Sequence, residues 1–164
     1  MSKKEILPGI HTVSSLLRWQ PHRAHSIWLE QNKSNQRIEQ LLGHANKLGI
    51  SVQQVQRAKL DLLCEGTQHQ GIAASCSPTP LVDEQELAAQ IAAATTPPLI
   101  LILDEVSDPH NFGACLRTAD AAGVDAVVVP QRNSAPLSPA VHKVASGATL
   151  RLKITKTTNI ARFI

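Results

Sequence analysis

The sequence predicts an α/β protein, and three features of the chain support this fold class. Short apolar runs alternate with stretches in which apolar residues recur at helical spacing. The run 99–103 ends at Asp104 and leads into a polar, proline-containing loop and then a helical stretch, an order that builds half of a ligand site in α/β proteins. Hydrophobic residues make up 43% of the 164 residues but aromatic residues only 2%, so aliphatic side chains must form the core.

The first 78 residues predict three helices and three strands. Ile10, Val13, Leu16 and Leu17 fall on one face of a helix, and Gly49 follows an apolar stripe at a position typical of a helix end. The predicted helices span 10–18, 38–48 and 58–64, and the predicted strands span 26–29, 50–55 and 71–76.

A change of composition separates this first unit from the rest of the chain. Residues 77–80 read SPTP, which favours a boundary, and an acidic, Ala-rich helix over 83–94 is closed by Pro97 and Pro98. The chain therefore divides into a unit 1–78, a linker 79–97 and a second unit 98–164. In the second unit we predict strands 99–103, 126–129 and 150–154, helices 111–121 and 138–146, and a helix that starts at 157.

Positive charge is unevenly distributed along the chain. The net charge is +3, but residues 1–78 hold nine Lys and Arg against five Asp and Glu. No acid follows Asp125, whereas six basic residues do: Arg132, Lys143, Arg151, Lys153, Lys156 and Arg162. A stretch of one sign favours a polyanionic partner, although a solvated basic surface gives the same pattern. With two Trp, two Phe and no Tyr, base stacking is an unfavourable way to grip nucleic acid.

The cysteines and apolar runs exclude several classes of protein. Cys64, Cys76 and Cys115 are odd in number and lack C-x-x-C spacing, so neither a disulfide framework nor a zinc site is expected, and we predict no metal. Reduced thiols, no signal peptide and no apolar run long enough to span a membrane predict a cytoplasmic protein.

The spacing N-x-G-x-x-x-R in the second unit has two readings. Gly113 and Arg117 share a helix face, and Asn111 lies near the helix start, so an anion could bind there beside a guanidinium that no side chain crowds. Alternatively, Asn111 caps the helix, Gly113 packs against a strand and Arg117 forms a salt bridge with Asp104 or Asp120.

Two further groups of polar residues could carry function. Asp104, Glu105 and Asp108 follow a strand, where they could orient Arg117 or, as a lesser option, bind a metal, or simply be solvated. His69 and Gln70 precede a strand and could read RNA, although turn residues look the same. A Rossmann nucleotide site is disfavoured because the first strand–helix loop lacks G-x-G-x-x-G.

Taken together, these motifs resemble the SpoU/TrmH branch of the SPOUT superfamily of RNA methyltransferases, and most closely its bacterial members that methylate a guanosine ribose in 23S rRNA. Gly9-Ile10-His11 and His69-Gln70-Gly71-Ile72 are similar to the N-terminal substrate-binding domain of that family. Leu101–Arg117 resembles its first methyltransferase motif, and 143–148 (KVASGA) its next block. The resemblance implies a small L30e/L7Ae-like domain followed by the first half of a SPOUT, Rossmann-like α/β-knot domain.

The resemblance also implies a function and its residues. The family members are S-adenosylmethionine-dependent ribose 2′-O-methyltransferases of 23S rRNA that work as homodimers, with no membrane partner. By this likeness Arg117 is the catalytic arginine, which stabilises a developing alkoxide, and Asn111 helps to place it or the RNA. The implied substrate-binding residues are His11, His69, Gln70, Gly113 and Lys143.

The chain departs from the family pattern in two ways. Leu150 stands where the family usually has Glu, and the Gly/Glu-rich and Ser/Asn-rich segments that build the cofactor pocket are absent before Ile164. We therefore assign no residue to cofactor binding and expect a shortened form that neither binds S-adenosylmethionine nor methylates, and whose dimerisation is in doubt. Two alternatives stay open: a non-catalytic RNA-binding module, and a small-ligand α/β enzyme that uses Arg117 as an anion clamp.

Overall fold

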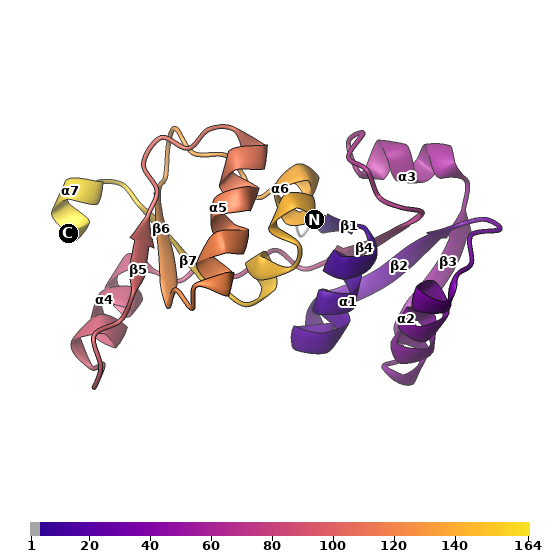
Figure 1. The fold of residues 1–164 in the computed structure, drawn as a ribbon, viewed down its shortest axis with the longest axis horizontal. Helices are drawn as coiled ribbons and strands as arrows, with labels where there is room; N and C mark the ends of the chain where they lie inside the picture. Colours follow the sequence, from indigo (N-terminus) through magenta and orange to yellow (C-terminus); the bar gives the residue numbers. More distant parts are fainter. Residues whose placement is uncertain (1–3) are drawn as a thin grey trace.

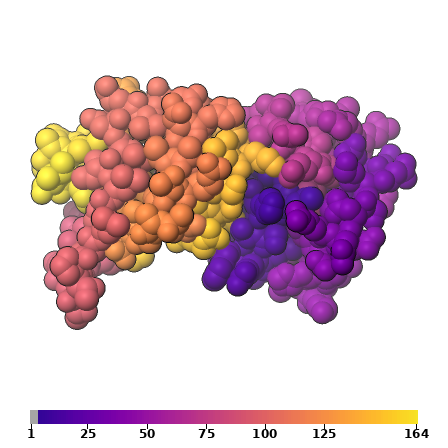
Figure 2. Space-filling view, viewed as in Figure 1, coloured from indigo at the N-terminus to yellow at the C-terminus, as the bar shows by residue number. Residues whose placement is uncertain are grey.

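The computed structural model describes residues 4–164, which form two sheets with helices on both faces of each. The first unit lies on the right of Figure 1, in indigo to magenta, and the second on the left, in orange and yellow. The two are in contact in the middle of the molecule, as the space-filling view in Figure 2 shows. The α/β fold class predicted from the sequence is confirmed.

The first sheet is mixed and has the strand order β1-β4-β2-β3. Its strands are β1 (Glu5–Pro8), β2 (Ala24–Glu30), β3 (Ser51–Val55) and β4 (Ile72–Cys76). β4 is antiparallel to both neighbours, and β2 and β3 are parallel. α1 (Ile10–Trp19) and α2 (Gln36–Lys47) cover one face, and α3 (Arg57–Leu63) covers the other, where Leu60 packs on Ala73. A short 3₁₀ turn, η1 (Pro21–Arg23), precedes β2.

The second sheet is entirely parallel and has the order β5-β6-β7. Its strands are β5 (Ile100–Ile102), β6 (Ala126–Pro130) and β7 (Lys153–Thr157). α5 (Pro109–Ala121) and α6 (Pro139–Ala145) cover one face around Phe112, Leu116 and Val141. α4 (Glu84–Ala92) and α7 (Ile160–Phe163) supply Leu87 and Phe163 to the other face. The predicted βαβαβ order is therefore confirmed.

Several elements differ from the sequence prediction, and the last helix, expected to start at 157, begins at Ile160 because Thr157 still belongs to β7. β1 was not predicted, because its four residues carry little alternation. The last strand begins at Lys153 rather than at residue 150, because residues 148–150 form a 3₁₀ turn, η2 (Ala148–Leu150). Within the segment 79–97, α4 packs on the second sheet and Val82 donates its N–H to the carbonyl of Ile154, while its role as a linker stays a prediction.

The two units meet at a buried polar cluster around Glu5, which we call the Glu5 cluster: Glu5, Arg23, Thr79 and His142. One oxygen of Glu5 accepts hydrogen bonds from the Thr79 amide at 2.8 Å and hydroxyl at 2.7 Å, and lies 3.4 Å from the Arg23 guanidinium. His142 of α6 is fully buried, with Nε2 at 3.5 Å from the same oxygen. A buried charge is tolerated only when it is paired in this way, so the cluster ties α6 to β1.

Apolar and backbone contacts extend this interface between the two units, which we call the joint. Leu150 is buried in the core of the first unit, and its carbonyl accepts a hydrogen bond from Gln20 at 2.8 Å. Gly147 has φ +94°, and a Cβ there would lie 2.3 Å from the Ser15 hydroxyl, so the approach of η2 to α1 requires glycine. Leu150 thus anchors the second unit in the core of the first.

Between residues 4 and 164, no helix combines the length and the apolar character needed to cross a lipid bilayer.

The Glu5 cluster predicts a pH-dependent stability. Burial raises the pKa of Glu5, but the hydrogen bond and charge of His142 and the two Thr79 hydrogen bonds lower it more, to below 4.5. A lowered folded-state pKa stabilises the protein above pH 4.5, and this stabilisation is lost as pH falls through that lowered pKa. We expect Glu5→Gln to lower the free energy of unfolding by about 2 kcal/mol at pH 7.

Urea denaturation of both proteins at pH 7 and pH 3.5 measures this effect. The difference between wild type and Glu5→Gln should shrink at the lower pH, because the wild-type carboxylate also becomes protonated. A difference that stays constant over this range contradicts the role given to the carboxylate charge.

Candidate functional site

Two of the predicted substrate-binding residues meet where the units join. Lys143 of α6 donates a hydrogen bond from Nζ to Oε1 of Gln70, which lies just before β4, at 3.0 Å. A Cβ on Gly9 would lie 2.6 Å from that Nζ, and Gly9 has φ +91°, so glycine is required there. Burial lowers the pKa of Lys143, while the nearby Cys64 thiol opposes this. The structure thus joins Gly9, Gln70 and Lys143, which lie far apart in sequence.

His69 is a buried residue that holds a turn. Only 3% of it is exposed, its Nε2 lies 2.9 Å from Asp61, and its Nδ1 accepts a hydrogen bond from the Gly71 amide at 3.0 Å. These bonds fix the left-handed turn at Gln70 and Gly71, which have φ +56° and +86°. His69 therefore presents Gln70 to the joint, and its own contact with RNA stays a prediction.

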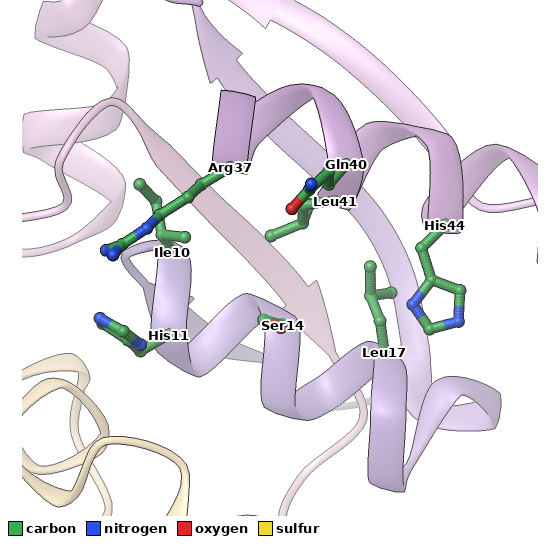
Figure 3. A pocket seen from close by; sticks show the side chains of 8 residues that line it. All are labelled: Ile10, His11, Ser14, Leu17, Arg37, Gln40, Leu41 and His44. Carbon is green, nitrogen blue, oxygen red and sulfur yellow. The ribbon is translucent and has the colours of Figure 1, made fainter. Parts of the chain in front are cut away.

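His11 is exposed in the first turn of α1 and lines a groove between α1 and α2 (Figure 3). It forms no ion pair with a described residue. Its position on the surface of the first unit is compatible with the predicted contact with substrate.

The helix that carries the arginine motif begins earlier than predicted. α5 starts at Pro109, and Asp108 is its N-cap, with a side chain that accepts a hydrogen bond from the Asn111 amide at 2.7 Å. The reading in which Asn111 caps the helix is therefore wrong. The Asn111 side chain is exposed in the first turn, six residues before Arg117 and about 120° from it around the helix axis.

Gly113 is buried where α5 crosses α6. A Cβ there would lie 2.7 Å from Cβ of Val144 and 3.0 Å from the carbonyl oxygen of Val141. The space that we expected beside Gly113 for a ligand is therefore filled by α6, and the alternative partner, a strand, is also wrong. Gly113 lets the two helices approach closely, so α6 carries Lys143 against α5.

Arg117 is exposed, and among residues 4–164 no carboxylate pairs with it. The alternative interpretation, in which Arg117 forms a salt bridge with Asp104 or Asp120, is therefore not supported among these residues. Asp120 instead binds Arg151, whose Nε lies 2.9 Å from its carboxylate. Arg151 also lies over the Trp19 ring of the first unit, at 5.9 Å. Asp120 thus pairs with Arg151 where the two units meet, and the Arg117 guanidinium can bind a ligand.

The carboxyl ends of the parallel strands lie on one edge of the second sheet, where such folds bind ligands. The loop after β5 is tied to the loop after β6, because Ala135 donates its N–H to Val106 at 2.9 Å. Asp104, Glu105 and Asp108 are all exposed at this edge. In the described part of the chain, no three His, Cys, Asp or Glu side chains gather as metal ligands.

We tested the same edge for the S-adenosylmethionine that the resemblance implies. Its acids Asp104, Glu105 and Asp108 are exposed, and no buried polar atom without a partner is found among the described residues there. Leu101 and Leu103 line an apolar groove of about 400 Å³ beside α5, but Thr118 is its only side chain with a hydroxyl, amide or charged group. An adenosine needs a largely apolar cleft with a few fixed polar groups. The described residues do not fit this requirement, so none is assigned to the cofactor.

The sequence reasoning missed the residues that join the two units. Glu5, Arg23, His142 and Leu150 were not singled out as a group, because their contacts join distant segments, as between Glu5 and His142. One local signal was available, because Gly9 lies in a motif of the first unit and Gly147 in a motif of the second. A glycine in a motif can mark a place where another backbone or side chain comes too close for a Cβ.

Comparisons with known proteins agree with this architecture. Residues 6–82 match a family model described as RNA 2′-O ribose methyltransferase substrate binding, and residues 98–164 match the SpoU rRNA Methylase family. The chain is 46% identical over 162 residues to a 23S rRNA (guanosine-2′-O-)-methyltransferase of Pseudomonas putida, and 44% identical to one of Shewanella oneidensis. Each match covers 99% of this chain and 65% of the relative, so the chain spans slightly less than two-thirds of the length of these relatives.

A solved structure supports the fold. The AdoMet-bound rRNA methyltransferase of Sinorhizobium meliloti superposes with a TM-score of 0.71 at 18% identity, covering 98% of this chain and 57% of that one. At this identity the likeness shows the fold alone.

The exposure of Arg117 and its lack of a carboxylate partner among the described residues predict that it contributes little to the stability of the fold. We expect Arg117→Ala to change the free energy of unfolding by less than about 0.5 kcal/mol, because the exposed side chain forms no ion pair with the described residues. Arg151→Ala is the control: it removes the Asp120 ion pair and the Trp19 contact, and should cost about 1 kcal/mol. Chemical denaturation of the three proteins measures both values, and a larger loss for Arg117→Ala than for Arg151→Ala contradicts a functional reading of Arg117.

Proposed function

The chain belongs to the SpoU family of rRNA methylases, and from this premise we propose that it supplies the RNA-binding and catalytic-arginine parts of a ribose 2′-O-methyltransferase. The observation that carries the proposal is the exposed guanidinium of Arg117, which pairs with no carboxylate of residues 4–164 and lies within the family's first motif. By the names of the relatives, the proposed substrate is a guanosine in 23S rRNA.

The chemistry of the reaction explains why an unpaired arginine is useful. A ribose hydroxyl is a poor nucleophile while it keeps its proton, and negative charge develops on the 2′-oxygen as that proton departs during attack on the methyl group. In the family S-adenosylmethionine supplies the methyl group when bound. A fixed guanidinium close to the hydroxyl stabilises the developing alkoxide or holds the neighbouring phosphate. An arginine already neutralised by a carboxylate would do this less well.

The contact between the two units suggests how RNA binding and Arg117 work together. We propose that residues 1–78 bind RNA and that residues 98–164 hold Arg117. Gln70 and Lys143 lie on either side of the joint in contact with each other, so RNA bound there would touch both units. α6 carries Lys143 and packs directly on α5, which carries Arg117. The homodimer that the resemblance implies remains an expectation.

The role of Arg117 is tested in a chimera in which residues 1–164 are joined to the portion of the Pseudomonas putida relative that they do not match. We expect this chimera to methylate a 23S rRNA transcript with labelled S-adenosylmethionine. Arg117→Ala should reduce the rate by at least about 100-fold, because one lost transition-state contact typically costs that much.

Arg162→Ala is the matched control for this measurement. It removes the same charge from the same unit, but Arg162 lies on α7, on the opposite face of the second sheet, where it pairs with Glu84. Equal losses in both variants contradict a catalytic role. A chimera that binds transcript normally but methylates equally well with and without Arg117 supports the non-catalytic alternative for these residues.

We also expect residues 1–164 to bind RNA without binding the cofactor. Titration calorimetry of the purified chain with S-adenosylmethionine should show no saturable heat, because the apolar groove beside β5 lacks the several fixed polar groups that would hold an adenosine. Binding of a 23S rRNA transcript at low salt should persist. Saturable cofactor binding would overturn this expectation and show that these residues hold more of the site than we assign.

A further inference from the structure

The groove between α1 and α2 has the composition of an anion-binding channel. Four residues of α1 and four of α2 line a cavity of about 320 Å³: Ile10, His11, Ser14, Leu17, Arg37, Gln40, Leu41 and His44 (Figure 3). Leu17 and Leu41 are buried and form the floor, whereas the polar side chains form the rims. None of the lining residues is an acid.

The charged and titratable side chains of the groove form no ion pair with the part of the chain that the structure describes. Within residues 4–164, neither Arg37 nor the two histidines pair with a carboxylate. The nearest acid on α2, Glu39, accepts a hydrogen bond from Ser34 at 2.7 Å instead. No described carboxylate therefore neutralises the charge of Arg37, and its exposed guanidinium can bind a ligand from solvent.

One end of the groove is the more positive. Figure 3 shows α1 and α2 running in the same direction, with His11 and Arg37 at one end and His44 at the other. The positive ends of both helix dipoles therefore lie beside Arg37, and the first turn of α1 has no side-chain cap. Together with the guanidinium, this end suits a phosphate group.

The groove also leads toward the joint between the units. Ile10 lines it and lines a second pocket, which contains Lys33, Arg57 and Gln70. Gln70 in turn contacts Lys143. In that second pocket the positive charge is offset by acids, since Arg57 lies 3.9 Å from both Glu30 and Asp61. The groove and the second pocket thus form a continuous polar surface that reaches α6, and only the groove part of this surface has no acidic lining residue.

We propose that the α1–α2 groove binds the phosphodiester backbone of the RNA, with Arg37 as the main phosphate contact and Gln40 and His44 continuing the track. This inference rests on the proposed function and extends it to residues outside the family-like motifs. Phosphate contacts of this kind position RNA without reading its sequence. The groove therefore sets the register in which RNA reaches Gln70 and Lys143.

The test measures binding of the full chain to an unmodified 23S rRNA transcript at several salt concentrations. Arg37→Gln should weaken binding about 5- to 10-fold and lower the slope of log affinity against log salt by about one. Gln40→Glu, nearly the same size, should weaken binding similarly by placing a negative charge in the groove. Both positions are exposed, so thermal unfolding should be unchanged.

Two controls lie on the same helix but do not line the groove. Lys47→Gln removes one positive charge from α2, and Asn46→Asp converts an amide into an acid there. Each matches one groove variant in its change of charge. We expect both to bind the transcript within about twofold of wild type, because they change net charge without changing the groove.

The outcomes separate this inference from the function on which it rests. If the wild-type chain fails to bind the transcript even at low salt, the proposed function fails. If wild type binds and the groove variants bind equally well, or lose no more than their controls, the inference alone is overturned. If Arg37→Gln abolishes only a thermal shift caused by inorganic phosphate and leaves transcript binding intact, the groove takes free phosphate and the RNA assignment is wrong.

Discussion

The buried carboxylate of Glu5 is the contact on which the arrangement of the two units depends. It lies on the first strand, yet its partners come from η1, from the start of the linker and from α6 of the second unit. A carboxylate that is only about one-seventh exposed must keep these partners, because removing one leaves a buried charge uncompensated. Leu150 adds an apolar anchor next to it. Together they fix α6 against the first unit, and α6 determines where Lys143 and α5 lie.

This joint also explains the distribution of charged side chains around the proposed site. Asp120, one turn after the arginine, is used by Arg151, which reaches across to Trp19. Asp108 is used as the helix cap. The acid one turn along from Arg117 on its own helix is thus occupied, and among residues 4–164 no carboxylate pairs with the guanidinium. A structural arginine would show the opposite pattern, with its carboxylate partner retained.

Much of the fold could be predicted from the sequence, because its elements follow local patterns. The apolar stripe of α2 with Gly49 past its end, and the run that forms β5, depend on neighbours a few residues away. β1 and the register of β7 could not be predicted in this way. β1 has only four residues and is recognisable as a strand only beside β4, while η2 is held in place by the core of the first unit.

The sequence by itself determined the fold class, the order of elements and the family motifs around Arg117, since each is written in residues close together in the chain. Only the tertiary structure decided what those residues do. It assigned Gly113 to helix packing, His69 to a turn and Asp120 to Arg151, and it brought Gln70 to Lys143 across 73 positions. The physical reason is that burial and pairing are set by contacts between distant segments, and local spacing carries no information about which distant carboxylate or helix will be near.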